Sequence, residues 1–234
     1  MLSIMNVRLQ LLVFASLAAG CEAARMAVPA DISGASEELP ITDRSSWTGA
    51  LADESFNLGA YKVADVDRKW DSKRSTSLGA MESTTASGGY RFKLIGGAGT
   101  LDGVCENENR GRSADLGGGL SFGSMVAKLA CRCSDASAVA ELSVEAATGN
   151  NTYDGVLKRA NDVLRVHSIN QREGGGDSYD PTGYRVDGEG APLGAVDVMG
   201  RGRVWISKTL QGRERDELAC LFAGLLLYQA PKER

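Results

Sequence analysis

The chain has 234 residues with 26 basic against 30 acidic side chains, a formal net charge of −4. This length allows one substantial hydrophobic core and indicates a single domain. The mild acidity and the lack of a Lys/Arg-rich block with interleaved aromatic residues argue against nucleic-acid binding. There is also no polybasic stripe that would attract anionic lipid.

The first twenty residues have the layout of an export signal. Arg8 is the one charged residue among them, and an apolar stretch, 9–19, precedes the small residue Gly20. A basic start, a short apolar segment and a small-residue cleavage site define such a signal. The apolar stretch is far shorter than the ~20 residues that a spanning helix needs. We therefore expect residues 1–20 to be a cleaved signal peptide, and a start at Met5 would still leave a complete signal.

The end of this segment, Leu17-Ala18-Ala19-Gly20-Cys21, resembles the lipobox of bacterial lipoproteins. The resemblance implies cleavage between Gly20 and Cys21 and acylation of Cys21 by chains such as palmitate, which together exceed the two signals needed for stable anchoring. Ala18 stands where the family usually has a branched residue. Glu22 stands where an inner-membrane retention signal is usually Asp, so the resemblance implies an outer-membrane lipoprotein facing the periplasm. The alternative is an ordinary secretory signal with an incidental cysteine.

Residues 21–46 are rich in Ala, Ser, Glu and Pro and show little periodicity. Such composition is typical of a flexible linker. We therefore expect a tether between the acylated Cys21 and a single β-rich domain spanning residues 47–234.

Short segments of strand-like composition, separated by glycine-rich turns, fill most of the expected domain. Many short strands at near-regular spacing, without helical segments between them, favour an antiparallel barrel or sandwich. The segments are 56–68, 89–96, 100–107, 119–133, 138–147, 161–169, 183–189, 193–199 and 202–209.

The cysteines beyond Cys21 permit disulfides, which exported proteins often use. Cys131 and Cys133 would point to one face of a strand. We expect a bridge from Cys105 to Cys131, with Cys133 as the alternative partner, and a buried free thiol at Cys220. A single C-x-C pair without a nearby histidine lacks the spacing of a zinc site.

The segment 212–229 differs from the rest because it has helical periodicity. Its positions between 218 and 228 are uncharged on every side, so the helix must be enclosed by protein or membrane. About eleven such residues cover only about half of the ~30 Å hydrocarbon core, which excludes spanning. Enclosure by the strands is therefore expected. The residues expected to form the core face are Leu218, Leu221, Phe222, Leu225 and Leu226.

The stretch GYRVDGEGAPLGAVDVMGRGRVWISKTLQGRERDELACLFAGLLLYQ, 183–229, is similar to the terminal block of the tubby C-terminal-like fold, which includes phospholipid scramblases and LURP-one-related proteins. It also resembles the ending of uncharacterised bacterial lipoproteins. The resemblance implies a mainly β fold, a β-barrel wrapped around a hydrophobic C-terminal helix. The alternative is an antiparallel β-sandwich with one packed C-terminal helix. The basic phosphoinositide-binding residues of tubby proteins and the calcium-binding segment of scramblases have no matching motif in this chain.

No arrangement of residues predicts a catalytic centre, a metal site or a cofactor. His167 is the single histidine, and a hydrogen-bonded or solvated histidine on a strand face is the favoured interpretation. The glycines at 96–99 begin like a dinucleotide fingerprint, but Asp102 replaces the third glycine, so a turn is expected. Two acidic groups are expected to be solvated surface residues. These groups are Asp65, Asp67 and Asp71, and Asp177, Asp180 and Asp187.

The sequence therefore favours a membrane-anchored envelope lipoprotein with a non-enzymatic binding or structural domain. Its expected partners are the membrane, through the lipid anchor, and a protein or lipid ligand that the sequence does not identify. One alternative is an envelope hydrolase whose carboxylates converge only in three dimensions. The other is a lipid-handling protein, by analogy with scramblases, in which the terminal helix leaves the barrel or borders a lipid-sized cavity.

Overall fold

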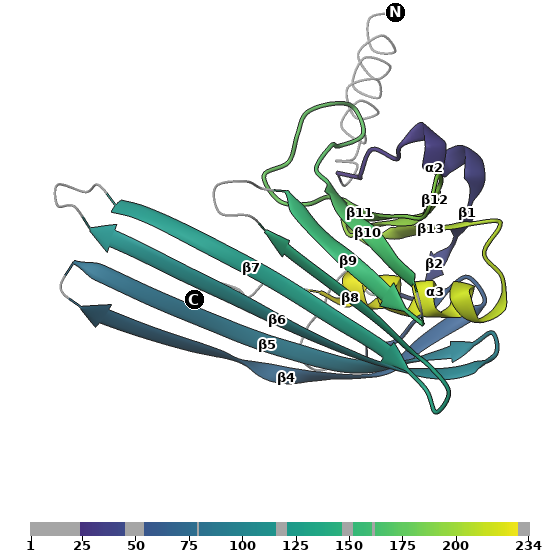
Figure 1. The fold of residues 1–234 in the computed structure, drawn as a ribbon, viewed down its shortest axis with the longest axis horizontal. Helices are drawn as coiled ribbons and strands as arrows, with labels where there is room; N and C mark the ends of the chain where they lie inside the picture. The colour runs from purple at the N-terminus through teal and green to yellow at the C-terminus, as the bar shows by residue number, and fades with distance from the viewer. Residues whose placement is uncertain are drawn as a thin grey trace, which may run out of the picture.

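The computed structural model describes residues 24–44, 54–78, 80–115, 121–146, 152–160 and 162–228. Within them the chain forms a short helix, a series of strands and a C-terminal helix (Figure 1). The elements are α2 (Ala30–Ala35), β1 (Ser36–Leu39), β2 (Ile41–Thr42), β3 (Phe56–Leu58), β4 (Tyr61–Leu78), β5 (Met81–Gly96), β6 (Gly99–Asp115), β7 (Ser121–Ser134), β8 (Val139–Ala146), β9 (Tyr153–Arg159), β10 (Asp162–Ile169), β11 (Gly183–Asp187), β12 (Pro192–Asp197), β13 (Arg203–Ser207) and α3 (Gly212–Leu227).

The strands form one antiparallel sheet that curls into a nearly closed barrel. From β2 to β13 each strand pairs with its neighbour along the chain, and β1 pairs with β13 at the far end of the sheet. The two edge strands β1 and β2 are separated by Pro40 alone, so the chain itself joins the two ends of the sheet. The Pro40 carbonyl accepts a hydrogen bond from the Gly59 N–H at 2.8 Å, which holds this corner against the β3–β4 turn. One continuous sheet confirms the predicted barrel over the alternative sandwich.

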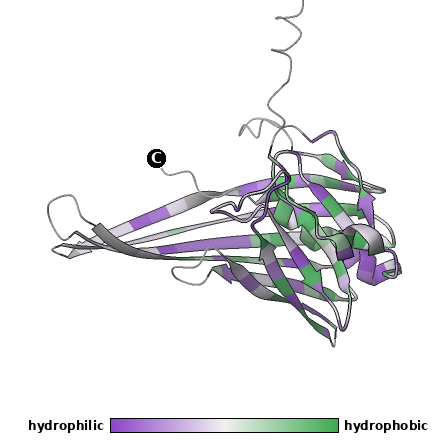
Figure 2. Cartoon of the chain, turned by 90° about the horizontal axis from the view of Figure 1, so that it is seen from above, coloured by the Kyte–Doolittle hydropathy of each residue, from purple (hydrophilic) through white to green (hydrophobic). Residues whose placement is uncertain are grey.

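Helix α3 lies inside the barrel, as the sequence predicts. Every residue of α3 from Asp216 to Leu227 is buried. The helix contacts β5, β6, β7, β8, β12 and β13. Figure 2 shows the hydrophobic residues gathered around α3 at the barrel end of the molecule. An apolar helix without a polar face is thereby shielded from water on all sides.

Four long strands continue past the barrel as an arm. We define the arm as residues 69–78 of β4, 81–88 of β5, 107–115 of β6 and 121–127 of β7; it projects to the left in Figure 1. The sequence predicts strands over 56–68, 89–96, 100–107 and 119–133 in this region, so the β7 part of the arm is predicted and nearly all of its β4, β5 and β6 parts are missed. Its Ser, Thr, Asn, Gly and charged residues lack the alternation of apolar and polar residues that marks a half-buried strand. The arm is stabilised mainly by pairing with neighbouring strands.

The predicted flexible tether is wrong over residues 24–44. Strand β1 closes the barrel, and α2 packs against β12 and β13. Met26 and Ile32 are fully buried in a second apolar cluster with Trp205, on the outside of the barrel. The domain therefore begins before residue 47, because strand pairing by β1 and a few buried apolar side chains dock this largely polar segment. The predicted signal peptide, 1–20, and Cys21 lie outside the described residues.

Leu225 provides a test of the enclosed helix. Its side chain is 1% exposed, so Leu225→Asp would place an unpaired charge in the core and remove a packed leucine. We expect a loss of more than about 4 kcal/mol of unfolding free energy, enough to unfold the domain.

The matched control is Val163→Asp, at a β10 position whose side chain is 65% exposed. Chemical and thermal denaturation should show a change of at most about 0.5 kcal/mol for this control. An intact Leu225→Asp domain with an unchanged melting temperature would show that α3 is not part of the core.

Candidate functional site

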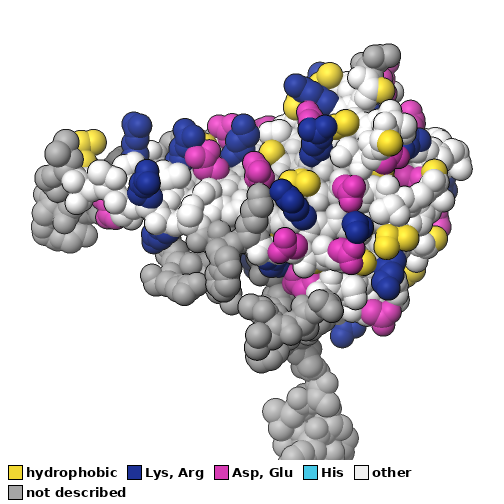
Figure 3. All heavy atoms as spheres, turned by 90° about the horizontal axis from the view of Figure 1, so that it is seen from below, with side chains coloured by type: hydrophobic (Ala, Val, Ile, Leu, Met, Phe, Trp, Pro, Cys, Tyr) yellow, Lys and Arg dark blue, Asp and Glu magenta, His cyan; other side chains and the backbone are white. Residues whose placement is uncertain are grey.

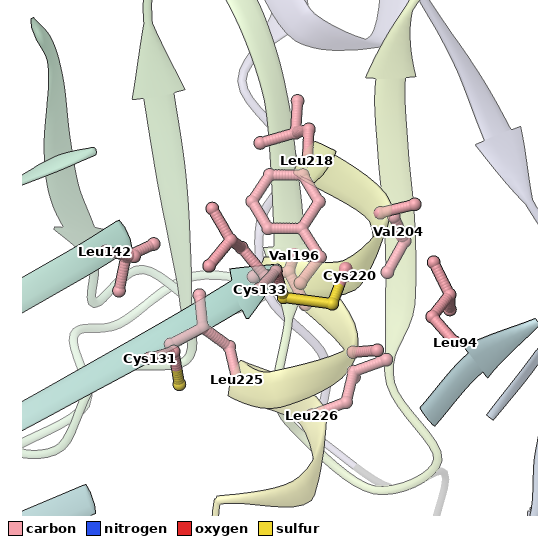
Figure 4. Close-up of a cluster of buried hydrophobic side chains, with 14 of the residues drawn as sticks. Leu94, Cys131, Cys133, Leu142, Val196, Val204, Leu218, Cys220, Leu225 and Leu226 are labelled. Atoms are coloured by element: carbon pink, nitrogen blue, oxygen red, sulfur yellow. A yellow bond between two sulfur atoms is a disulfide. The ribbon is translucent and has the colours of Figure 1, made fainter. Parts of the chain in front are cut away.

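The five residues predicted to form the core face of the helix all lie in the barrel interior. Each is at most 3% exposed. In Figure 4, Leu218, Leu225 and Leu226 of α3 lie among side chains of the surrounding strands. The labelled strand residues around them are Leu94, Leu142, Val196 and Val204. The interior of the barrel is thus filled by the chain's own helix.

Two disulfides reinforce this arrangement. The Cys105–Cys131 bond, the pairing favoured from the sequence, joins the adjacent strands β6 and β7. The Cys133–Cys220 bond joins β7 to the middle of α3, so the expected free thiol at Cys220 is wrong (Figure 4). Cys131 and Cys133 do share the inner face of β7, but the sequence does not show which strand faces a given turn of the helix. Cross-linking positions 87 residues apart stabilises the fold by about 4–5 kcal/mol in the chain-entropy estimate.

Gly224 allows α3 to approach the other disulfide closely. A Cβ at this position would lie 2.8 Å from Cys105 Sγ and 3.0 Å from Cys131 Sγ. Both distances are shorter than an ordinary van der Waals contact. Glycine is therefore required here by the space available, although it lowers the intrinsic stability of a helix interior.

The C-terminal end of α3 is capped inside the barrel. The last carbonyls of a helix lack partners within the helix and carry its negative dipole end. Tyr90 Oη donates to the Gly224 carbonyl at 2.7 Å, Arg44 Nη2 to that of Leu226 at 2.5 Å, and Arg68 Nη2 to that of Leu227 at 3.0 Å. Burial raises the pKa of Tyr90, so its hydroxyl remains a donor.

The N-terminal end of α3 is held by Asp216. Its carboxylate accepts hydrogen bonds from Tyr61 Oη at 2.7 Å and from the Ala98 N–H at 2.9 Å. Burial and, next, the hydrogen bond to Asp216 raise the pKa of Tyr61 to about 12. Gly97, in the turn between β5 and β6, has φ of +58° and would place a Cβ 2.2 Å from Asp216 Oδ1. The glycine-rich stretch 96–99 is therefore a hairpin turn, as predicted, and it packs against the start of the helix.

A small cleft beside this turn contains two carboxylates. Asp135 and Asp216 line it together with Arg213, and its volume is about 10 Å³, room for about one water molecule. Asp135 accepts hydrogen bonds from Arg213, including one from Nη2 at 2.8 Å, and this pairing is the main cause that lowers the pKa of Asp135. The acid of a hydrolytic carboxylate pair needs a raised pKa. The Asp135–Arg213 pair therefore fastens α3 to the barrel, and the lowered pKa of Asp135 does not favour the hydrolase alternative.

The remaining candidates for chemistry lie on the outside of the barrel. His167 Nδ1 is 2.7 Å from Asp154 Oδ1 on neighbouring strands, which confirms a hydrogen-bonded histidine on a strand face. Asp65 pairs with Lys93 at 2.8 Å. Across the described part of the chain, no group of three or more His, Cys, Asp or Glu residues is placed to hold a metal ion.

One sequence pattern was missed: residues 119–123 match the G-x-S-x-G pattern of hydrolase nucleophiles. That motif needs a sharp turn from a strand into a helix. Ser121 instead begins β7, a strand that runs back along the arm toward the barrel. The local structure is therefore not a nucleophile elbow.

The inner face of the arm is lined by small and polar side chains. It continues the row of inward residues Tyr90 and Cys105, and the next members are Ala86, Asn107 and Asn109. Asn107 is 6% exposed. Asn107 Nδ2 and Asn109 Oδ1 are buried and have no hydrogen-bond partner within the described residues. Buried polar groups usually find partners, so these two atoms at the root of the arm are an exception among the described residues.

The outer face of the arm is charged. Arg74 and Arg110 lie in one row of the sheet, on either side of Thr85, and Arg112 lies two residues further along β6. Glu108 pairs with Arg110 at 2.9 Å. Figure 3 shows Lys and Arg side chains standing along the arm. The arm thus presents two chemically different faces to solvent.

Both long edges of the arm are open among the described residues. The outer part of β4 pairs with β5 alone, and residues 121–127 of β7 pair with β6 alone. Open edges are sites for strand addition, which proteins usually block with charged residues or proline. The β4 edge carries Lys73 and Arg74, whereas the β7 edge, SFGSMVA, has neither a charge nor a proline. The β7 edge is therefore the less protected one.

Comparison with known proteins gives no relative: no family model, no curated protein and no solved structure matches this chain. Among the described residues, none of the helices combines the length and the apolar composition needed to cross a membrane. Function must accordingly be inferred from the chain's own residues.

The contact between Gly224 and the disulfide leads to a matched pair of substitutions. We expect Gly224→Ala to destabilise the domain by about 1–3 kcal/mol, because the added methyl group overpacks the core against two sulfur atoms. Denaturant titration under oxidising conditions measures this loss.

Gly34→Ala is the control, since Gly34 lies in helix α2 and a Cβ there would meet nothing within 4 Å. This change should be neutral or stabilising by up to about 1 kcal/mol. Equal effects of the two substitutions would contradict a close contact at Gly224.

Proposed function

We propose that this protein is a membrane-anchored lipoprotein of the cell envelope, on the periplasmic face of the outer membrane. Its barrel is a non-enzymatic scaffold, and the four-stranded arm is its binding surface. The lipobox-like Cys21 supports the anchor. The two disulfides support an oxidising compartment, where such bonds form and persist.

The single observation that carries the binding role is the arm itself. The main core cluster includes none of the described residues in 73–86 and 109–127. Ordering each of these residues costs about 1–2 kcal/mol of backbone entropy, yet they contribute almost nothing to the core. A structure of this kind is well suited to recognition. Its open β7 edge can take up a partner by strand addition, and its two faces can contact the side chains of the added strand.

Membership of the tubby C-terminal-like fold remains part of this proposal, supported by the barrel around a C-terminal helix. A lipid-handling role in which the helix leaves the barrel is less favoured. The Cys133–Cys220 bond ties α3 to β7 covalently, and capping at both helix ends would also have to break. The barrel is therefore better suited to a fixed scaffold than to a mobile gate.

The anchor is tested by metabolic labelling with an alkyne analogue of palmitate. We expect the wild-type protein to take up the label and to remain in the membrane fraction after carbonate washing. Cys21→Ser should lose the label and enter the soluble fraction. The acyl chains are then absent, and the apolar stretch 9–19 is too short to span the membrane. Membrane retention of Cys21→Ser to the wild-type extent would refute the lipoprotein assignment.

The binding role is tested by shortening the arm. Residues 73–86 and 109–127 are each replaced by Asn-Gly, because Ser72 pairs with Ser87 and Glu108 with Lys128 and this dipeptide closes such pairs as a tight hairpin. The shortened protein should melt within about 5 °C of the wild type, because the core is unchanged.

The functional readout is a photocrosslinking amino acid placed in the full-length protein in its native envelope. Position 124 on the β7 edge should give a discrete crosslinked product, whereas position 163 on the barrel should not. Excess shortened protein, which lacks the arm, should not compete for the partner, so the product at position 124 should remain. Excess intact soluble domain should compete and remove that product. Equal crosslinking from both positions, or no product from either, would contradict a binding role for the arm.

A further inference from the structure

The chain is fixed to the barrel almost immediately after the proposed lipid anchor. Met26 is fully buried. Its N–H donates to Asp197 Oδ2 at 3.2 Å, and its carbonyl accepts from Arg203 Nη2 at 2.9 Å. Asp197 is 1% exposed and pairs with the same Arg203 Nη2 at 2.9 Å. One ion pair, whose carboxylate is buried, therefore holds both polar groups of the Met26 backbone.

The residue before Met26 is held as well. The Arg25 carbonyl accepts a hydrogen bond from the Glu173 N–H at 2.9 Å, and the Ala27 N–H donates to the Gln171 carbonyl at 2.9 Å. Glu173 and Gln171 belong to the loop 170–182, which connects β10 to β11. The segment around Met26, where the chain joins the barrel, is therefore hydrogen-bonded directly to this loop.

The distance from anchor to barrel is short. Four residue steps separate Cys21 from Arg25, and an extended chain covers at most about 3.5 Å per step, about 14 Å in all. A tether over residues 21–46 would have allowed about 88 Å on the same basis. The loop 170–182 must therefore lie close to any membrane in which Cys21 is anchored.

This loop also has side chains suited to a lipid interface. Tyr179 is 77% exposed, the highest value among the exposed large hydrophobic residues of the described chain. Tyrosine places an apolar ring and a polar hydroxyl at the level of the lipid headgroups. Arg172 Nη2 donates a hydrogen bond to Ser178 Oγ at 3.0 Å. This bond holds the residue that precedes Tyr179 in place.

We propose that the loop 170–182 is the membrane-contact surface of the domain, with Tyr179 at the phospholipid headgroup interface and the short link from Cys21 holding it there. This inference rests on the proposed lipid anchor. The loop carries one basic residue, Arg172, and three acidic ones, so attraction to anionic lipid does not drive the contact. The contact is therefore expected in zwitterionic membranes and at high salt.

The orientation has a consequence for the arm. In Figure 1 the loop 170–182, drawn in green, lies at the top of the barrel, whereas the arm projects to the left from the strands below it. A membrane at the loop leaves the arm clear of the lipid. The protein would then present its arm from a fixed position beside the membrane.

The test uses acylated full-length protein in phosphatidylcholine vesicles that contain phospholipid brominated near the headgroup. Bromine quenches tryptophan fluorescence on close contact, and the natural tryptophans are a constant background in all variants. Tyr179→Trp should show at least a two-fold greater added quenching than Val163→Trp, whose position is 65% exposed on the barrel wall. Melting temperatures within about 3 °C of the wild type would show that both variants are folded.

A third variant adds a spacer of twenty Gly and Ser residues between Glu22 and Ala23 of Tyr179→Trp. The added quenching should fall to the level of Val163→Trp, because the loop is no longer held at the surface. Quenching at position 179 no greater than at position 163, in protein that carries the palmitate label, would overturn the proposed contact surface. Persistent quenching with the spacer would overturn the role of the short link, whereas loss of the palmitate label itself would refute the anchor.

Discussion

The whole domain depends on enclosing one helix that has no polar side. Helix α3 is buried from Asp216 to Leu227, so side chains must cover it all round and polar groups must reach both of its ends. The sequential strands supply the cover, and the corner at Pro40 joins the two ends of the sheet. Arg44, Arg68 and Tyr90 reach the last carbonyls. An unenclosed α3 would expose a large apolar surface together with unpaired backbone groups.

Enclosure of α3 also determines where function can reside. Among the described residues, the barrel interior is filled by the chain's own helix, which is buried from Asp216 to Leu227 and cross-linked from Cys133 to Cys220. The carboxylates near the helix start, Asp135 and Asp216, are occupied by Arg213, Tyr61 and backbone donors. What the fold leaves available is its outside surface, and the arm is the part of that surface whose residues serve the core least.

The sequence predicted the parts of the molecule that carry strong patterns and missed those that do not. Leu218, Leu221 and Leu225 repeat at helical spacing, and their all-round apolar context correctly placed the helix inside the barrel. The arm has no such pattern, because a sheet exposed on both faces has no reason to alternate apolar and polar residues. Met26 and Ile32 are too sparse to form a periodic signal. The partner of Cys220 depends on which strand faces one turn of α3, and that relation exists only in three dimensions.

The docked N-terminal segment and the projecting arm would together fix how the domain is oriented relative to a membrane at Cys21. Residues 24–44 are packed into the barrel, so an anchor at Cys21 would restrain the domain's distance from the membrane and also its rotation. A long flexible tether would average over all orientations and would give a rigid arm little advantage over a flexible segment. With a short link to the proposed anchor, the Asp197–Arg203 pair would transmit the position of the anchor to the sheet, and the sheet would transmit it to the arm. The ordered arm and the short link therefore support the same proposal, that this domain holds a surface in one place relative to the membrane.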